Sequence, residues 1–93
     1  MIKSFRDKDT EKVFNRLLSR GLPQNIQHLA LRKMVILDAA TEINTLRVPP
    51  GNRLEALKGV RKGQHSIRIN DQWRICFKWK SGDAYNVEIA DYH

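Results

Sequence analysis

The chain has 93 residues, which suits a single domain over residues 1–93 with one modest core. Hydrophobic residues make up 41% and charged residues 29%, a composition that excludes a disordered chain. Seventeen Lys and Arg against ten Asp and Glu give a net charge of +7, which favours a polyanionic partner, nucleic acid before an anionic membrane surface. A solubilising surface that binds nothing is the alternative.

Cysteine usage and targeting signals bear on where the chain works. Cys76 is the only cysteine, which excludes an internal disulfide and a cysteine-rich metal site and fits a reducing cytoplasm. No apolar stretch approaches the length of a membrane span, and the N-terminus lacks the layout of a signal peptide. We therefore expect a cytoplasmic protein with no membrane partner.

The N-terminal part predicts a strand and then a helix. Residues 1–5 alternate in part and are predicted as a strand that joins a later sheet. Asp7 or Asp9 can cap the helix that follows. That helix is expected to end, and the next to begin, at residues 21–23, Gly-Leu-Pro. Its narrow apolar stripe comprises Val13, Phe14, Leu17 and Leu18.

The longest predicted helix runs from about residue 25 to residue 46. Its apolar stripe comprises Ile26, Leu29, Ala30, Met34, Leu37, Ala40 and Ile43. Two helices joined by a tight turn can cover one face of a sheet. Residues 49–51, Pro-Pro-Gly, end the helix, a short strand is expected over residues 53–57, and residues 59–63 form a loop with basic residues between glycines.

Three runs after residue 64 alternate apolar and polar residues with a period of two, the pattern of half-buried strands. One face carries Ile67, Ile69, Trp73, Ile75, Phe77, Trp79, Tyr85, Val87 and Ile89, and the other carries Ser66, Arg68, Arg74, Cys76, Lys78, Lys80, Asn86 and Glu88. A strand, two helices and four strands predict an α+β fold, with both helices packed on the apolar face of an antiparallel sheet.

The two faces also predict the strand register, because opposed residues of an antiparallel hairpin point to the same side of the sheet. Loops over residues 70–72 and 81–83 keep the large apolar residues together. The expected pairs are Arg68 with Arg74, Trp79 with Tyr85, Ile75 with Ile89 and Arg74 with Ala90. Arg68 and Arg74 then lie side by side away from the helices, with Tyr92 one step past Ala90.

This register gathers basic residues into a candidate phosphate site. The set comprises Arg53, Lys58, Arg61, Lys62, Arg68, Arg74, Lys78 and Lys80. An arginine side chain binds phosphate through two hydrogen bonds and keeps its proton near neutral pH. Arg68 and Arg74, if opposed, repel each other unless an anion lies between them, which favours a bound phosphate. A solvated sheet face is the alternative.

The C-terminal residues Asp91, Tyr92 and His93 are the second candidate for chemistry. A histidine titrates near neutral pH, and a tyrosine donates a proton or stacks on a base. The triplet is informative because it continues a central strand whose register directs Tyr92 toward the arginines. His65 is expected to be a partly buried structural residue, and Cys76 has no evident base that would make it a nucleophile.

Five segments together carry a family resemblance: Met-Ile-Lys-Ser-Phe at residues 1–5, Leu-Lys-Gly at 57–59, residues 63–70, Trp-Arg-Ile-Cys-Phe at 73–77 and the final Asp-Tyr-His. They resemble the HigB toxins of the RelE/ParE superfamily, most nearly the GraT-like members, over nearly the whole chain. The resemblance implies a RelE-like α+β toxin of a type II toxin–antitoxin system, encoded with a HigA-like helix-turn-helix antitoxin. It further implies binding at the ribosomal A site, with mRNA and 16S rRNA as partners, and mRNA cleavage without a metal or other cofactor.

The family's catalytic residues correspond to Lys58, Arg74, Asp91, Tyr92 and His93. Metal-free cleavage by the ribose 2′-hydroxyl needs a base, an acid and cations on the phosphate. We expect His93, helped by Asp91, to transfer protons, and Tyr92 to orient or stack on the substrate. Arg74 and Lys58 are expected to act on the phosphate, with further RNA contacts from Arg68, Arg61, Lys62, Arg53 and Lys78.

One position departs from the family pattern, and two other functions stay open. Glu55 stands where some members have a functional histidine, and because a carboxylate cannot stabilise negative charge on a phosphate, slower cleavage or different contacts are expected. A ParE-like gyrase poison would share the fold, although Arg74 and the C-terminal triplet argue against it. A non-enzymatic inhibitor would bind RNA or the ribosome through the basic face alone.

Overall fold

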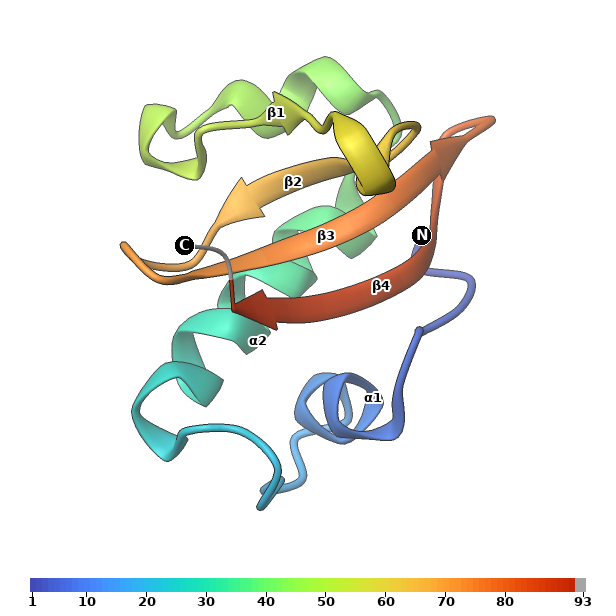
Figure 1. Cartoon of the computed structure of the whole chain (residues 1–93). Helices are drawn as coiled ribbons and strands as arrows, with labels where there is room; N and C mark the ends of the chain where they lie inside the picture. The colour runs from blue at the N-terminus through green and yellow to red at the C-terminus, as the bar shows by residue number, and fades with distance from the viewer. Residues whose placement is uncertain (92–93) are drawn as a thin grey trace.

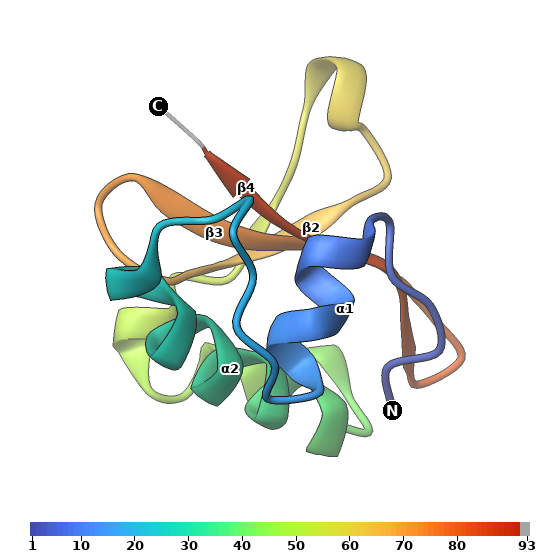
Figure 2. The same ribbon diagram turned by 90° about the horizontal axis from the view of Figure 1, so that it is seen from below.

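A four-stranded antiparallel sheet lies at the centre of the fold, in the strand order β1-β2-β3-β4 (Figure 1). Its strands are β1 (Glu55–Ala56), β2 (His65–Arg68), β3 (Trp73–Lys80) and β4 (Asp83–Asp91). Two helices, α1 (Lys8–Phe14) and α2 (Gln24–Ala39), lie on one side of the sheet (Figure 2). Short 3₁₀ turns, η1 (Ile43–Arg47), η2 (Pro50–Asn52) and η3 (Gly59–Arg61), lie between α2 and β2. This computed structural model describes residues 1–91, and the predicted α+β class is confirmed.

The core lies between α2 and the sheet. Residues spaced by three or four along α2 are buried: Ile26, Ala30, Met34 and Leu37. They belong to one apolar cluster with sheet residues Ile67, Ile75, Phe77, Val87 and Ile89. Full burial of one such large side chain stabilises the fold by about 1.5–3 kcal/mol. The prediction that the helices cover the apolar face of the sheet is therefore confirmed.

Both helices are shorter than predicted. The α1 helix ends at Phe14, because Arg16 takes a left-handed φ of 63°. Leu17 and Leu18 are 59% and 65% exposed, so their assignment to a buried stripe is wrong. The α2 helix ends at Ala39, and Leu46 reaches the core from the separate turn η1. Its burial explains why the apolar spacing continued past the true end of the helix.

The N-terminal segment pairs with the edge of β4, as predicted, although it forms two isolated parallel bridges and not a continuous strand. The bridges join Ile2 to Ala84 and Phe5 to Val87. A β-bulge at Asn86 interrupts the edge between them, and the Asn86 amide donates to the Ser4 hydroxyl at 2.9 Å. This segment covers an edge that would otherwise expose unpaired backbone groups.

The predicted register is right at one end of the β3–β4 hairpin and wrong at the other. Arg74 pairs with Ala90, and Arg74 also pairs with Arg68 on β2, as predicted. Nearer the turn, Lys78 pairs with Tyr85, because the bulge adds one residue to β4. The predicted pairing of Trp79 with Tyr85 is therefore wrong: Trp79 pairs with Ala84. Ser81 and Gly82, at φ 53° and 83°, make a two-residue turn in place of the predicted loop.

The bulge can be tested at Asn86, which is exposed and has a φ of 52°. A β-branched residue is strained in this region, so we expect Asn86→Val to lower the free energy of unfolding by about 1–2 kcal/mol. Asn86→Gly is expected to stay within about 0.5 kcal/mol of the parent, since glycine adopts positive φ freely. Urea unfolding measures both, with Lys80→Val as a control at an exposed strand position. Equal stability of the valine and glycine variants would contradict a fixed bulge.

Candidate active site

The sheet face turned away from α1 and α2, called the outer face here, holds the candidate site. It carries Ser66, Arg68, Arg74, Cys76, Lys78, Tyr85, Glu88 and Ala90. The turn η3 stands over this face, opposite the helices (Figure 2). Leu57 forms a small buried cluster with Cys76 and Ala90, which fixes the start of the η3 loop against β3 and β4. Lys58 follows Leu57 directly in the chain and is exposed.

Arg74 is the most firmly held cation of the outer face. It is 8% exposed, its Nε donates to the Ser66 hydroxyl at 2.6 Å, and its Nη2 donates to the Arg53 carbonyl at 2.5 Å. The same Nη2 lies 3.5 Å from a Glu55 carboxylate oxygen. Strands β1 and β2 and the residues that precede β1 therefore fix the guanidinium. A fixed buried cation can stabilise developing negative charge without rearranging during a reaction.

Arg68 and Arg74 are neighbours as predicted, but no anion is needed to keep them together. Arg74 is paired with Glu55, and Arg68 forms an ion pair with Asp71 in the β2–β3 turn. Two carboxylates of the protein thus offset the repulsion between the guanidinium groups. The argument that this repulsion implies a bound phosphate is therefore wrong.

Among the other basic residues of the set, one forms contacts that hold the fold together and the rest are exposed cations. Arg61 donates to Glu88 at 3.0 Å and to Gln64 at 3.1 Å, which ties η3 to the outer face of β4. The exposed cations of the set without a side-chain ion pair within residues 1–91 are Lys58, Lys62, Lys78, Lys80 and Arg53. These five side chains are free of protein carboxylates and can meet a phosphate backbone.

The predicted catalytic triplet is described only at its first residue. Asp91 is exposed, pairs with Trp73 at the end of β4, and accepts a hydrogen bond from the Gln72 side chain at 3.0 Å. Alternation along β4 directs Asp91 to the side of the sheet opposite Ala90. Tyr92 and His93 lie outside the described residues, so their predicted place near the arginines stays a prediction.

Two other residues with potentially reactive side chains, Cys76 and His65, lie in surroundings that suit structural roles. Burial raises the pKa of the Cys76 thiol, which keeps the thiol protonated and a poor nucleophile. The His65 ring lies 6.2 Å from the Phe77 ring, and its Nδ1 is buried without a hydrogen-bond partner in the described part of the chain. No three His, Cys, Asp or Glu side chains within residues 1–91 come together as metal ligands would.

Acid is expected to destabilise the protein through His65. Burial lowers the pKa of its imidazole below the ordinary value of 6.5. The unfolded chain therefore binds a proton first, so this contribution to stability is complete above pH 6.5 and is lost as the pH falls through the lower, folded pKa. Melting temperatures measured in steps from neutral to mildly acidic pH should fall for the wild type and fall less for His65→Phe. Parallel curves for the two proteins would contradict this role.

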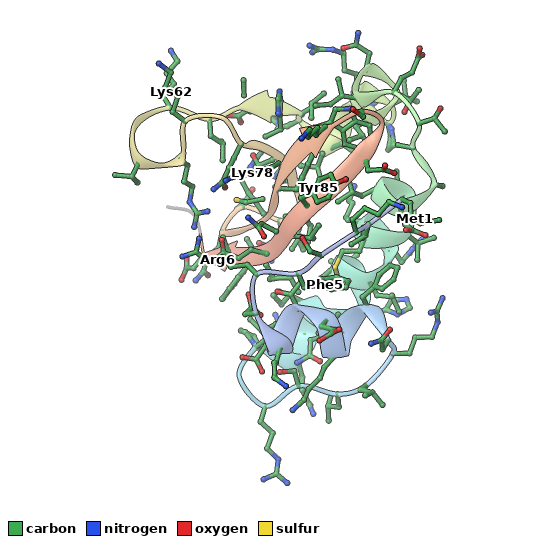
Figure 3. All side chains as sticks on the ribbon, turned by 90° about the vertical axis from the view of Figure 1, so that its right-hand side faces the viewer. Met1, Phe5, Arg6, Lys62, Lys78 and Tyr85 are labelled. Carbon is green, nitrogen blue, oxygen red and sulfur yellow. The ribbon has the colours of Figure 1, made fainter. Side chains whose placement is uncertain are left out.

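Sequence patterning assigned Tyr85 to the apolar face of the sheet, and this assignment is wrong, because Tyr85 lies on the outer face. Its side chain lies opposite Lys78 on the neighbouring strand (Figure 3), and both line an open groove with Gly63, Trp79 and Lys80. The signal that could have revealed it is Ser81-Gly82, which fits a two-residue hairpin turn and forces a compensating bulge in β4.

The fold is also found in solved toxin–antitoxin complexes. Chains of two structures of the YoeB–YefM complex from Staphylococcus aureus align with TM-scores of 0.56 and 0.57 over 100% of this chain and 98% of theirs. Sequence identity to both is 14%, so this likeness concerns the fold alone.

No helix of residues 1–91 is long and apolar enough to cross a membrane.

Sequence comparison identifies the family. The family described as "RelE-like toxin of type II toxin-antitoxin system HigB" matches residues 3–93. Toxin HigB-1 of Vibrio cholerae serotype O1 is 44% identical over 90 residues, covering 96% of this chain and 95% of that protein. Endoribonuclease HigB of Proteus vulgaris is 39% identical over 94 residues, covering 100% of both. The chain belongs to the HigB-like toxin family of type II toxin–antitoxin systems, and its partner is an antitoxin.

Proposed function

We propose that this toxin is a ribosome-dependent endoribonuclease that cuts mRNA in the A site and thereby inhibits translation and growth. One structural observation carries the proposal: the row Arg68–Arg74–Ala90 crosses three strands and places a half-buried and a buried cation beside the C-terminal end of β4, which Tyr92 and His93 follow in the sequence. The similarity to a protein named Endoribonuclease HigB supports the same activity. The site of action is the cytoplasm, where ribosomes translate mRNA.

The proposed reaction is an internal transesterification of RNA. The ribose 2′-oxygen bonds to the adjacent phosphorus while the bond from phosphorus to the 5′-oxygen breaks, which leaves a cyclic phosphate and a free 5′-hydroxyl. His93, helped by Asp91, removes the 2′-proton and returns a proton to the leaving oxygen. Tyr92 orients the nucleotide by stacking.

The cations of the outer face have separate roles in this reaction. Arg74 has its Nε and Nη2 committed to Ser66 and to the Arg53 carbonyl, so it acts mainly as a fixed positive charge near the phosphate. Lys58 is exposed and next to the buried Leu57, and it contacts the phosphate directly. Arg68, Arg53, Lys62 and Lys78 contact the RNA backbone nearby, while Arg61 positions η3 through Glu88.

Glu55 is expected to restrain the activity. Its carboxylate is 54% exposed and lies 3.5 Å from Arg74, where it repels an incoming phosphate. Removing one exposed charge of this kind changes an interaction free energy by up to about 1 kcal/mol. Loss of the repulsion between Glu55 and the phosphate should therefore let Glu55→Gln raise kcat/KM for mRNA cleavage by about two- to fivefold. Glu11→Gln, at an exposed position on α1, is the matched control. Slower cleavage by Glu55→Gln would instead give the carboxylate a part in the chemistry.

Primer extension on mRNA from translating ribosomes tests the proposed function. Incubation with the toxin should produce new mRNA ends at A-site codons, and addition of a HigA-like helix-turn-helix antitoxin should prevent them. Intact mRNA on stalled ribosomes would favour a non-enzymatic inhibitor that contacts 16S rRNA. Normal translation combined with inhibited DNA supercoiling would favour a gyrase poison.

A further inference from the structure

An open groove crosses the outer face at the turn end of the β3–β4 hairpin, away from Arg74. It is lined by Gly63, Lys78, Trp79, Lys80 and Tyr85. We propose that this groove is a nucleotide subsite, in which the Tyr85 ring stacks on one base of an RNA strand and Lys78 and Lys80 hold the adjacent phosphates. The inference rests on the proposed function and extends it to a second contact with the RNA.

The β-bulge creates this subsite. Because Asn86 is the extra residue, Tyr85 lies directly opposite Lys78 and shares the outer face with it. Tyr85 is only half-buried, so part of the residue is open to solvent. Gly63, at φ 94°, has no atom within 4 Å of the position of a Cβ, which leaves the opposite wall of the groove open. A partly exposed aromatic ring beside lysines is the arrangement that binds single-stranded nucleic acid.

The charge around the groove favours an anionic ligand. Lys62, Lys78 and Lys80 are exposed and have no ion pair in the described part of the chain. The acidic residues nearby on β4 are already paired. Glu88 is paired with Arg61 and with Arg6, at 3.0 and 3.7 Å, and Asp83 is paired with the N-terminal ammonium group at 3.3 Å.

The position along β3 separates this subsite from the cleavage chemistry. Lys78 lies four residues beyond Arg74 along β3, a distance of about 13 Å. Several linked nucleotides are therefore needed to occupy both places. The same nucleotide chemistry could come from the mRNA or from 16S rRNA, and the two sources need separate tests.

Steady-state cleavage on programmed ribosomes gives the first test. Loss of one base–aromatic stack should raise KM of Tyr85→Ala at least about fivefold with little change in kcat, and Tyr85→Phe should restore the wild-type KM. Lys78→Gln, which alters no packing, should raise KM as well, whereas Lys12→Ala on α1 should not. Thermal unfolding shows whether each variant is folded. Wild-type KM values for both Tyr85→Ala and Lys78→Gln would overturn the subsite while leaving the proposed function intact.

Photocrosslinking identifies the occupant independently of cleavage. The His93→Gln protein is bound to ribosomes carrying 4-thiouridine either in the mRNA or in 16S rRNA, irradiated, and analysed by mass spectrometry. A nucleotide adduct on the peptide containing Tyr85 or Lys78 supports the subsite, and the labelled strand identifies the source. Adducts confined to other peptides in both experiments would overturn it. If the wild type cuts no mRNA, the proposed function fails, and the crosslink still decides the subsite.

Discussion

Replacement of His93 by glutamine is expected to slow mRNA cleavage by about 100- to 10,000-fold, the usual contribution of general acid–base catalysis. Glutamine keeps hydrogen-bonding capacity but cannot take up and release a proton near neutral pH. Single-turnover cleavage on programmed ribosomes measures the loss, and growth after induction should recover in parallel. The same variant should still bind ribosomes, because the basic outer face is unchanged.

Two controls make the His93 result interpretable. The melting temperature of His93→Gln should match that of the wild type, which separates lost chemistry from lost folding. The matched exposed histidine His28, on α2, should tolerate the same change without loss of cleavage. Cleavage within about tenfold of the wild type would assign proton transfer to another group, since general acid–base contributions begin at about 100-fold.

The sheet was predictable because many residues of its strands independently indicate the same register and the same buried face. The two long strands, of eight and nine residues, alternate apolar and polar side chains, which leaves only one way to bury Ile75, Phe77 and Ile89 together. The pairing of Arg74 with Ala90 follows from that alternation, as does the choice of face for the basic residues. Slipping the register by one residue would turn the apolar set toward water.

The details that differ depend on single residues and on contacts distant in sequence. The bulge at Asn86, a single residue with a left-handed backbone, places Tyr85 on the outer face. A period-two pattern assumes an uninterrupted strand and therefore does not reveal one extra residue. The end of α1 is set likewise by the backbone at Arg16. Asp71 follows Arg68 closely, but Glu55 reaches Arg74 only through the pairing of β1 with β2, and a charge pattern alone does not reveal that partner.

Loss of the Arg74 side chain is expected to impair folding as well as cleavage. Arg74→Ala leaves the Ser66 hydroxyl and the Arg53 carbonyl without their charged donor, which should lower the free energy of unfolding by about 2–3 kcal/mol. For a domain of this size the melting temperature should then fall by roughly 8–24 °C. Thermal and urea unfolding measure the change. Unaltered stability would mean that these hydrogen bonds are not formed in solution.

Because of this double role, lost toxicity in Arg74→Ala does not by itself assign Arg74 to the chemistry. Arg74→Lys keeps the positive charge but, as a compact ammonium, cannot reach Ser66 and the Arg53 carbonyl together. Ser66→Ala removes one anchor and leaves the guanidinium charge in place. If Arg74 acts through its fixed charge, cleavage measured well below the melting temperatures should rank Ser66→Ala above Arg74→Lys and Arg74→Lys above Arg74→Ala. Equal cleavage by all three, at temperatures where each is folded, would restrict Arg74 to holding β1 against β2 and leave the phosphate to Lys58.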